Sequence, residues 1–401
     1  MAECFVSRHP ILDASLDLFA YELQYHSGPK HTSAISSQAE TARLILNTYI
    51  DIGLENLVGN NPAFMGLSRE FFTAADLIHF PPEQVVLEVT KNTKIDPELI
   101  QSLRRLTENG YRIALDNFIS HYNLTPIVEL SDYIKIDSRA LDHAEVKQHI
   151  ALLKPYGAKL LVQNIINTDE LDFYRDLGAH LFQGGFIPKP EITSSKQLPT
   201  NHLNVLQLLA KLNNPDTDID ELEALISIDV PLSVKTLKCV NSPISGLRRT
   251  VDSVRQAIIY LGRETIKNWV ALLALAKIEG RSPELTTTVL VRARLCQLLA
   301  KAAHLQADES FFTVGLLSAL DTMMGAPMSE ILEQLPLTPD VKAALLKQEG
   351  PKGEAIHCAI ALERGNPSGL KFATLEWRTI ADQYLPAMRW ADESSQLFKA
   401  A

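Results

Sequence analysis

The sequence predicts an α/β barrel of the TIM type followed by an all-α helical domain, and three observations support this prediction. Over residues 1 to about 192, short apolar runs alternate with amphipathic stretches, which is typical of a parallel sheet covered by helices. From Asn201 to about Leu385 the apolar spacing is helical throughout, and strand signals are nearly absent. The chain has 401 residues, which is too long for one ordinary core and suggests two domains.

Eight short runs rich in Val, Ile and Leu are the predicted strands of the barrel. Amphipathic stretches such as Ser37–Asp51 and Pro97–Asn109 lie between them and are predicted helices. The number of units and their span of roughly 190 residues suit a TIM-like barrel. The predicted strands are Cys4–Ser7, Leu18–Gln24, Ala63–Leu67, Val85–Val89, Arg112–Asp116, Tyr133–Asp137, Lys159–Val162 and Leu181–Gly184.

Polar side chains occupy corresponding ends of several predicted strands. In barrels of this type the chemistry lies at the carboxyl ends of the strands, and packing alone hardly accounts for so many polar groups there. The candidate site residues are Glu22, Glu88, Asp116, Lys135, Asp137 and Gln183.

The change from one domain to the next is predicted at a segment rich in proline and polar residues. Pro188, Pro190 and Pro199 flank Thr193–Ser195, and this composition is typical of a linker. We therefore expect a barrel domain over residues 1–192, a linker over 193–200 and a helical domain over 201–401. The predicted helices of the second domain include Val251–Leu261, Thr265–Ile278, Thr287–Ala303, Phe311–Met324 and Pro339–Leu346.

Charge and cysteine use narrow the class of protein. The net charge of −10 disfavours binding to nucleic acid or to an anionic membrane surface. No apolar run reaches the ~18 residues that span a bilayer, and the segment Met1–Phe5 lacks the basic and apolar regions of a signal peptide. The four cysteines are far apart, which favours reduced thiols over a disulfide or zinc framework. We expect a cytoplasmic protein with no nucleic-acid partner and no membrane insertion.

Six short motifs follow one another in a fixed order along the first domain: Tyr21–Tyr25, Leu87–Thr90, Leu115–Phe118, Tyr133–Asp137, Val162–Ile166 and Phe182–Phe186. They resemble the EAL domain, a family of barrel phosphodiesterases that hydrolyse cyclic di-GMP with two divalent cations. The resemblance implies that Glu22, Glu88 and Asp116 stand at metal-binding positions. It places Lys135 and Asp137 on the strand whose lysine helps to position the catalytic water. It also matches Gln183 to the glutamine of the family's Gln-Gly-Tyr motif.

The same resemblance shows departures at positions that the family uses for chemistry. Exchanging Asp for Asn and Glu for Gln removes two negative charges near the metal positions, so a two-metal site is not expected. We therefore expect a degenerate phosphodiesterase with no catalytic residue, no cofactor and no metal, in which Glu22, Glu88 and Asp116 remain as candidates for a single metal. The departures are Gly66 for Asn, Asn117 for Asp, Gln163 and Ile166 for Glu, Lys91 for Glu, His9 for Gln, and the loop Ile119–Tyr122, which lacks the family's Gly-Thr-Gly.

Three segments of the second domain, Pro231–Ser233, Leu237–Ser242 and Ser253–Gly262, resemble the HDOD domain. Asn241 is expected to end a helix there because asparagine tolerates unusual backbone angles. HDOD domains are related to HD-type metal phosphohydrolases but lack the metal ligands, and Gly315–Leu320 lies where a hydrolase reads Leu-Leu-His-Asp. The three histidines of this domain are not expected to form a metal cluster; they are His202, His304 and His357.

Together the two resemblances imply a bacterial signalling protein that is not an enzyme and acts by protein–protein interaction. Its partners would be signalling proteins, and its output would be linked to cyclic di-GMP, as in motility or biofilm formation. Two alternatives stay open: a residual cyclic di-GMP phosphodiesterase that uses Glu22, Glu88, Asp116 and Lys135, and a sensor that binds cyclic di-GMP without hydrolysis. Glu88, Asp116 and Lys135 could also form a buried ion-pair network across the barrel mouth, in which Lys135 and Lys91 offset the acids.

Overall fold

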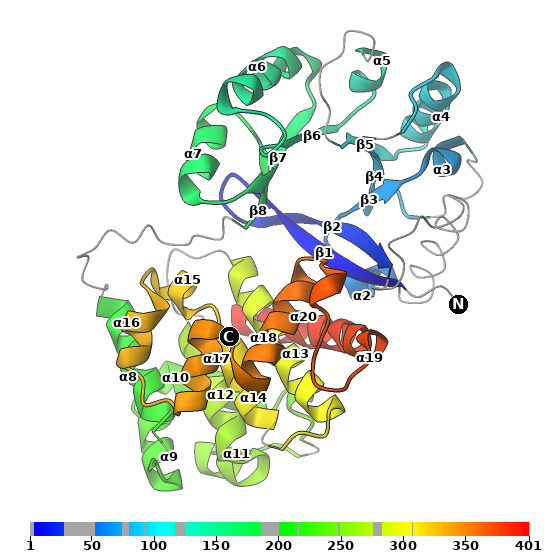
Figure 1. The fold of residues 1–401 in the computed structure, drawn as a ribbon. Helices are drawn as coiled ribbons and strands as arrows, with labels where there is room; N and C mark the ends of the chain where they lie inside the picture. Colours follow the sequence, from blue (N-terminus) through cyan, green and yellow to red (C-terminus); the bar gives the residue numbers. More distant parts are fainter. Residues whose placement is uncertain are drawn as a thin grey trace. The chain divides into compact units, whose positions relative to one another are not determined.

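The computed structural model describes residues 4–27, 53–73, 80–91, 93–116, 125–185, 200–214, 216–247, 249–275, 283–306 and 308–400. They belong to two compact units, one of Met1–Pro188 with Glu363–Pro367 and one of Lys189–Leu362 with Ser368–Ala401. The first unit holds a barrel and the second is helical (Figure 1). The predicted linker lies outside the described residues up to position 199, and the domain limits at 192 and 201 stay a prediction.

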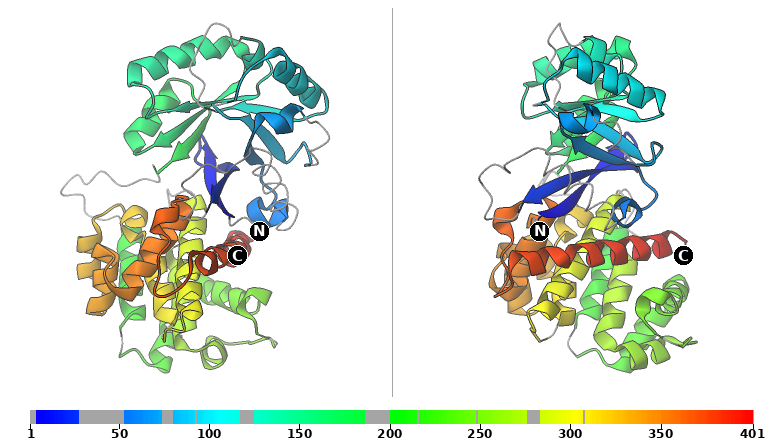
Figure 2. Two further views of the ribbon diagram at one scale, coloured as in Figure 1. Left: turned by 45° about the vertical axis from the view of Figure 1, so that its right-hand side comes forward. Right: turned by 90° about the vertical axis from the view of Figure 1, so that its right-hand side faces the viewer.

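Eight strands close into a barrel in the order of the sequence (Figures 1 and 2). This confirms the predicted TIM-like class. Four of the predicted strands have the observed bounds, whereas β1, β2 and β7 are longer and β5 ends one residue earlier. The strands are β1 Cys4–Asp13, β2 Leu18–Ser27, β3 Ala63–Leu67, β4 Val85–Val89, β5 Arg112–Leu115, β6 Tyr133–Asp137, β7 Lys159–Ile165 and β8 Leu181–Gly184.

The first strand departs from the predicted parallel arrangement. β1 pairs antiparallel with both β2 and β8, while each neighbouring pair from β2 to β8 is parallel. A parallel partner would need a crossover of a dozen or more residues, but only a short turn separates Asp13 from Leu18. The Asp13 carboxylate accepts hydrogen bonds from the N–H groups of Ser15 and Asp17, and Leu16 has a φ of 65°. This turn makes β1 and β2 a hairpin.

An apolar cluster fills the barrel interior. Phe64 and Tyr133 meet in it edge to face, with their ring centroids 5.0 Å apart. Because side chains alternate across a strand, the residue two positions further along each strand faces the same interior. On the seven parallel strands that next position lies toward the carboxyl end. The cluster consists of Ile11, Ala20, Phe64, Val86, Ala114, Tyr133, Leu161 and Leu181.

Helices follow the strands around the outside of the barrel (Figure 2). Three of them begin at a side-chain cap, since Asp96, Asp142 and Asn167 each accept a hydrogen bond from the N–H group three residues on. Such a cap typically stabilises a helix by ~1 kcal/mol. The predicted helix Ser37–Asp51 lies outside the described residues. The described helices are α2 Leu54–Val58, α3 Arg69–Thr73, α4 Pro97–Glu108, α5 Thr125–Val128, α6 His143–Leu153, η3 Lys154–Tyr156 and α7 Thr168–Asp176.

The second unit is built from helices, and none of its described residues lies in a strand, which confirms the predicted all-α class. Among the described residues, no helix has the length and apolar character needed to cross a membrane. The helices are α8 Thr200–Leu212, α9 Ile219–Ser227, α10 Val230–Val240, η4 Pro243–Ser245, α11 Val254–Leu261, α12 Arg263–Leu275, α13 Pro283–Ala302, α14 Asp308–Leu317, α15 Leu320–Met324, α16 Met328–Glu333, α17 Pro339–Lys347, α18 Gly350–Glu363, η5 Pro367–Gly369, α19 Trp377–Asp382 and α20 Tyr384–Ala400.

The single helix predicted over Phe311–Met324 is two helices in the structure. The chain breaks at Ser318, whose hydroxyl donates to the carbonyl of Gly315 at 2.7 Å and accepts from Arg292 Nη1 at 2.9 Å. A serine hydroxyl that bonds nearby backbone competes with regular helix geometry. Ala319 then takes a φ of −120° as the N-cap of α15.

The motifs of the helical unit are explained by hydrogen bonds at helix ends. Asp229 caps α10 and Ser253 caps α11 through their side chains. Asn241 ends α10 with ordinary backbone angles, φ −83° and ψ 0°, so the predicted reason for an asparagine here was wrong. Its side chain instead exchanges two hydrogen bonds with the backbone of Val251, at 2.8 and 2.9 Å. The asparagine thereby fixes the connection between α10 and α11.

Candidate active site

Five of the six residues predicted from the sequence face one another inside the barrel, at the carboxyl ends of its parallel strands. Each lies two positions beyond a member of the apolar cluster, so alternation turns it into the same interior. They are Glu22 on β2, Glu88 on β4, Asp116 directly after β5, Lys135 on β6 and Gln183 on β8.

Lys135 lies at the centre of this group. Its Nζ donates to Glu22 Oε1 at 2.9 Å and to Glu88 Oε1 and Oε2 at 2.9 and 3.0 Å, and lies 3.8 Å from Asp116 Oδ1. The lysine side chain is 1% exposed. A buried ammonium is costly unless it is paired and hydrogen bonded, and three carboxylates from three strands meet that need. The predicted ion-pair network of Lys135 with Glu88 and Asp116 is therefore present, and Glu22 belongs to it as well. Lys91, which was also predicted to offset the acids, is exposed and pairs with none of these three described carboxylates.

Two glutamines hold the outer carboxylates of this group. Gln183 Nε2 donates to Glu22 Oε2 at 2.7 Å, and Gln163 Nε2 donates to Asp116 Oδ1 at 3.3 Å. A glutamate at position 163 would be an acceptor only when ionised and could not make this bond. The sequence marked Gln163 as a lost ligand and missed this contact, although its spacing from Leu161 predicts that it faces inward.

Asp137, the sixth predicted residue, is held by partners of its own. Its Oδ1 accepts from Asn164 Nδ2 at 2.8 Å and from the N–H of Arg139 at 2.9 Å. Asn164 has a φ of 64°, and the pairing of β7 with β8 shifts register at this point. Gly184 has a φ of 155°, and a Cβ there would lie 2.2 Å from the carbonyl oxygen of Ile165. The backbone therefore fixes this corner of the barrel mouth.

The other departures from the family motif differ in where they lie. Gly66 pairs with Glu88 in the register of β3 and β4, and a Cβ at Gly66 would meet Thr90 Cγ2 at 3.4 Å and no other described atom within 4 Å. Ile166 is 52% exposed and lies outside the group around Lys135. Asn117 and the loop Ile119–Tyr122 lie outside the described residues.

His9 borders the group from β1. It is paired with Glu22 in the register of the hairpin, and its Nε2 lies 2.9 Å from the hydroxyl of Ser7. Burial lowers the pKa of His9, while the nearby charges of Glu22 and Lys135 act on it in opposite directions. At neutral pH the structure thus places a neutral imidazole beside the carboxylates.

The two buried glutamates have pKa values displaced in opposite directions. Burial acts to raise the pKa of Glu22, but the charge of Lys135 and hydrogen bonds from Lys135 and Gln183 outweigh it and hold this pKa at about 2. For Glu88 the effect of burial is larger than that of Lys135, and the pKa is raised to about 7. The charges of Glu22 and Asp116 add to this increase, whereas Lys135 opposes it. One ammonium cannot neutralise three carboxylates, so the most buried carboxylate, that of Glu88, binds a proton more readily.

The charge and donor chemistry of this group fit one divalent cation. With all three carboxylates ionised, the group has a net charge of −2, and carboxylate oxygens are the ligands that Mg²⁺ and Mn²⁺ prefer. Their present geometry is organised around the ammonium of Lys135, and among the described residues no three acidic, histidine or cysteine side chains stand at metal-ligand spacing. A cation at this place would be held by Glu22, Glu88 and Asp116.

Family comparison assigns both halves of the chain. The family model of the EAL domain matches residues 57–190, and that of the HDOD domain matches residues 198–335. Glu22 lies before the matched EAL segment, so it is the closed barrel that places this residue in the site.

Two relatives align with most of this chain, and a solved structure matches less than half of it. The cyclic di-GMP phosphodiesterase CdgJ of Vibrio cholerae is 28% identical over 99% of this chain and 94% of its own length. The uncharacterised protein YuxH of Bacillus subtilis is 29% identical over 90% of this chain and 91% of its own length. BlrP1 of Klebsiella pneumoniae, solved with calcium and cyclic di-GMP, is 18% identical over 45% of this chain and 54% of its own, with a TM-score of 0.38.

The expectation that the chain is not an enzyme is contradicted by the match to CdgJ. CdgJ is named as a phosphodiesterase, and the alignment covers nearly the whole length of both chains. The loss of activity was inferred from single motif positions, and the structure weakens that inference at two of them. Gln163 supports Asp116, and Ile166 lies outside the group around Lys135. The chain is therefore a two-domain protein in which an EAL domain is followed by an HDOD domain.

Proposed function

We propose that the barrel hydrolyses cyclic di-GMP, opening one phosphodiester bond of the cyclic dinucleotide to give a linear product. The observation that carries this proposal is the group of three carboxylates around Lys135, at the strand ends where barrels of this type hold their chemistry. The match to the Vibrio phosphodiesterase over 99% of the chain supports it.

The charge of the site sets the first requirement for this reaction. A phosphodiester is an anion, so three carboxylates with one ammonium would repel it. Glu22, Glu88 and Asp116 would hold a divalent cation, which would restore attraction. When bound, such a cation polarises a phosphoryl oxygen and lowers the pKa of a bound water. We therefore expect activity only with Mg²⁺ or Mn²⁺.

Lys135 supplies the positive charge that belongs to the chain itself. Burial acts to lower its pKa, but Glu88, Glu22 and Asp116 outweigh this and raise it, so the side chain stays an ammonium at neutral pH. From the centre of the group it can donate a hydrogen bond to the attacking water or to a phosphoryl oxygen. Negative charge on those oxygens is stabilised by a fixed donor of this kind in the transition state.

The two glutamines act on the carboxylates rather than on the substrate. Gln183 and Gln163 each donate an amide N–H to one outer carboxylate. These bonds hold Glu22 and Asp116 in place, so that little reorganisation is needed when a cation and the substrate bind. Electrostatic stabilisation is strongest when its groups are oriented in advance.

The proposal is tested by following the conversion of cyclic di-GMP to its linear product by chromatography. Lys135→Met should lower kcat by roughly a hundredfold or more, the typical effect of removing one fixed electrostatic stabiliser. Glu22→Gln should weaken Mn²⁺ binding as well as activity. The matched control is Lys154→Met, an exposed lysine of η3, which should keep full activity.

Binding and turnover must be measured separately. Saturable binding of cyclic di-GMP by calorimetry, with the dinucleotide recovered intact in the presence of Mg²⁺ and Mn²⁺, would contradict the proposal and identify a sensor instead. Equal rates for the native chain and Lys135→Met would show that the group around Lys135 is not the active site. Signalling-protein partners and a cytoplasmic location stay predictions from the sequence.

A further inference from the structure

His9 belongs to the same layer of the barrel as the group around Lys135. In the register of the hairpin, Ile11 lies opposite Ala20 and His9 lies opposite Glu22. Ile11 and Ala20 are members of the apolar cluster. Because side chains alternate along a strand and β1 runs antiparallel to β2, His9 faces the same interior as Glu22, one step nearer the mouth than the cluster. The strand β1 thus adds an imidazole to a layer in which β2, β4 and β6 supply charged groups.

The imidazole of His9 has one nitrogen engaged and one nitrogen open. Its Nε2 lies 2.9 Å from the hydroxyl of Ser7, which is a buried residue. Among the residues that the structure describes, no hydrogen bond reaches Nδ1 of His9. When Nε2 carries the hydrogen and donates it to Ser7, Nδ1 keeps a lone pair. The contact with Ser7 then holds the ring, and the open nitrogen can accept a proton.

The proposed hydrolysis needs a proton acceptor, because the attacking water loses a proton as its oxygen bonds to phosphorus. The group around Lys135 is poorly suited to that role. Both carboxylate oxygens of Glu88 accept hydrogen bonds from Lys135, and the other two carboxylates of the group are proposed cation ligands. Gln163 and Gln183 carry neutral amides, which are not bases. Asp137 lies outside the group, and its Oδ1 is held by two donors of its own.

We propose that His9 is the general base of this reaction and accepts, through Nδ1, the proton of the water that attacks the phosphodiester. The inference rests on the hydrolysis proposed for the barrel. As the water oxygen bonds to phosphorus, the bond from phosphorus to one sugar oxygen breaks, and that oxygen takes up a proton from solvent. The imidazolium then returns its proton to solvent, so one water is consumed for each bond opened. At pH 8 an imidazole is neutral and ready to accept a proton.

The test measures kcat and KM for cyclic di-GMP with Mn²⁺ at pH 8 in the native chain, His9→Ala and His9→Gln. Both variants should lower kcat about a hundredfold or more, the usual contribution of a positioned general base, and should change KM little. Glutamine keeps hydrogen-bonding groups but is not a base, so a merely structural role of His9 would survive in His9→Gln. A native kcat in His9→Gln would overturn the proposal.

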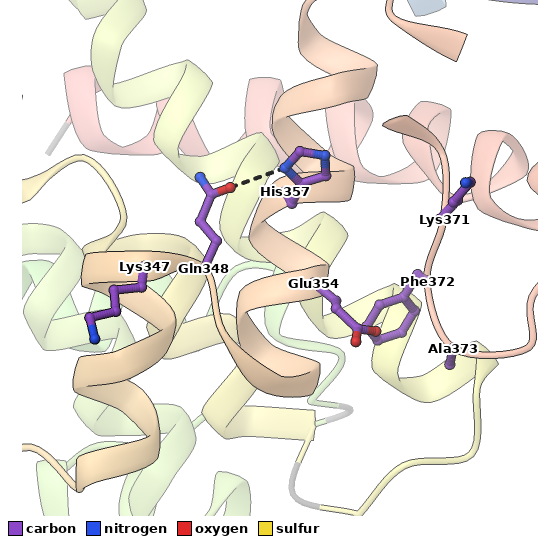
Figure 3. Close-up of a pocket in the computed structure, with 7 residues that line it drawn as sticks. All are labelled: Lys347, Gln348, Glu354, His357, Lys371, Phe372 and Ala373. Carbon is purple, nitrogen blue, oxygen red and sulfur yellow. Dashed lines mark hydrogen bonds between the residues drawn. The ribbon is translucent and has the colours of Figure 1, made fainter. Parts of the chain in front are cut away.

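The matched control is His357→Ala, which changes an exposed histidine of the helical unit. Nδ1 of His357 lies 3.0 Å from Gln348 Oε1, the contact drawn in Figure 3. His357 lines a pocket of about 460 Å³, in which Lys347 and Lys371 end on opposite sides of the view. These charges do not converge on one point, so the pocket carries no proposal of its own. His357→Ala should keep the native kcat.

Added imidazole gives a second readout. In His9→Ala the free base can enter the space left by the side chain and should restore part of the rate, more so for substituted imidazoles of higher pKa. Lys135→Met lacks a different group and should not respond. Equal responses of these two variants to imidazole would overturn the proposal.

Cation binding separates a general base from a residue that acts through Glu22. Calorimetry without substrate should give the native Mn²⁺ affinity in His9→Gln, because the three carboxylates are unchanged. Weaker Mn²⁺ binding there would show that His9 positions Glu22 and would overturn the proposal. No hydrolysis by the native chain would refute the function proposed for the barrel, whereas hydrolysis that persists at the native rate in His9→Gln would refute this inference alone.

Discussion

Replacing Glu88 by glutamine should remove a pH dependence of stability from the metal-free chain. Burial raises the pKa of Glu88 from an ordinary 4.5 to about 7, against the pull of Lys135. The folded chain therefore holds a proton that the unfolded chain releases between these values. The stability that this proton contributes is fully present below about pH 4.5 and is lost as the pH rises through about 7.

The magnitude follows from the size of the shift. About 2.5 pKa units at about 1.4 kcal/mol each correspond to ~3–4 kcal/mol in the free energy of unfolding. Glu22 acts in the opposite sense: its folded pKa is about 2, so its contribution is present above about pH 4.5 and lost as the pH falls through about 2. Between about pH 5 and pH 8 the contribution of Glu22 is constant, and Glu88 dominates the change.

The assay is urea denaturation with EDTA at several pH values across this window, followed by circular dichroism. The native chain should lose stability toward pH 8 relative to Glu88→Gln, by up to ~3–4 kcal/mol. Comparing the two chains cancels the contribution of His9, whose pKa is also displaced. The control Glu108→Gln, an exposed glutamate at the end of α4, should follow the native chain. Identical pH slopes in all three proteins would contradict a raised pKa of Glu88 in the folded chain.

Four further predictions concern the same two units. Lys135→Met should lower the free energy of unfolding by ~3–5 kcal/mol at pH 8 and by less at pH 5, where the carboxylates can protonate; equal losses in urea titrations would contradict this. Gly66→Asn adds an amide oxygen at a position with room for it, so calorimetry should show tighter Mn²⁺ binding, and unchanged affinity would count against a cation there. Gly184→Ala should lower the melting temperature sharply, because its Cβ would lie 2.2 Å from a backbone oxygen; a native melting temperature would exclude that close approach. Asn241→Ala loses two hydrogen bonds to the backbone and should cost ~1–3 kcal/mol, which denaturation of the helical unit would report.

The strand positions and the location of the site could be predicted because both depend on alternation. A buried parallel strand is a short apolar run, and such runs gave four strands with the observed bounds. Five polar residues then follow the apolar cluster at a spacing of two, so their meeting inside the barrel follows from the strand period alone. Glu22 and Gln183, far apart in the sequence, are joined by a 2.7 Å hydrogen bond for this reason.

What the sequence could not show depends on contacts between distant side chains and on short turns. The direction of β1 is set by the turn after Asp13, whose carboxylate binds two N–H groups. The role of Gln163 becomes visible only when Asp116 lies within reach. Asn241 was assigned to a helix end for its backbone freedom, but its side chain is what the fold uses. A motif gives the residue type, whereas the contact that requires it comes from the fold.

The proposed hydrolysis is tested most directly by the product formed from cyclic di-GMP by the purified chain with Mn²⁺, measured beside the same reaction with EDTA and with Lys135→Met. We expect linear dinucleotide with the native chain and Mn²⁺, none with EDTA, and roughly a hundredfold slower formation with Lys135→Met. Intact cyclic di-GMP after prolonged incubation with either Mg²⁺ or Mn²⁺ would contradict it.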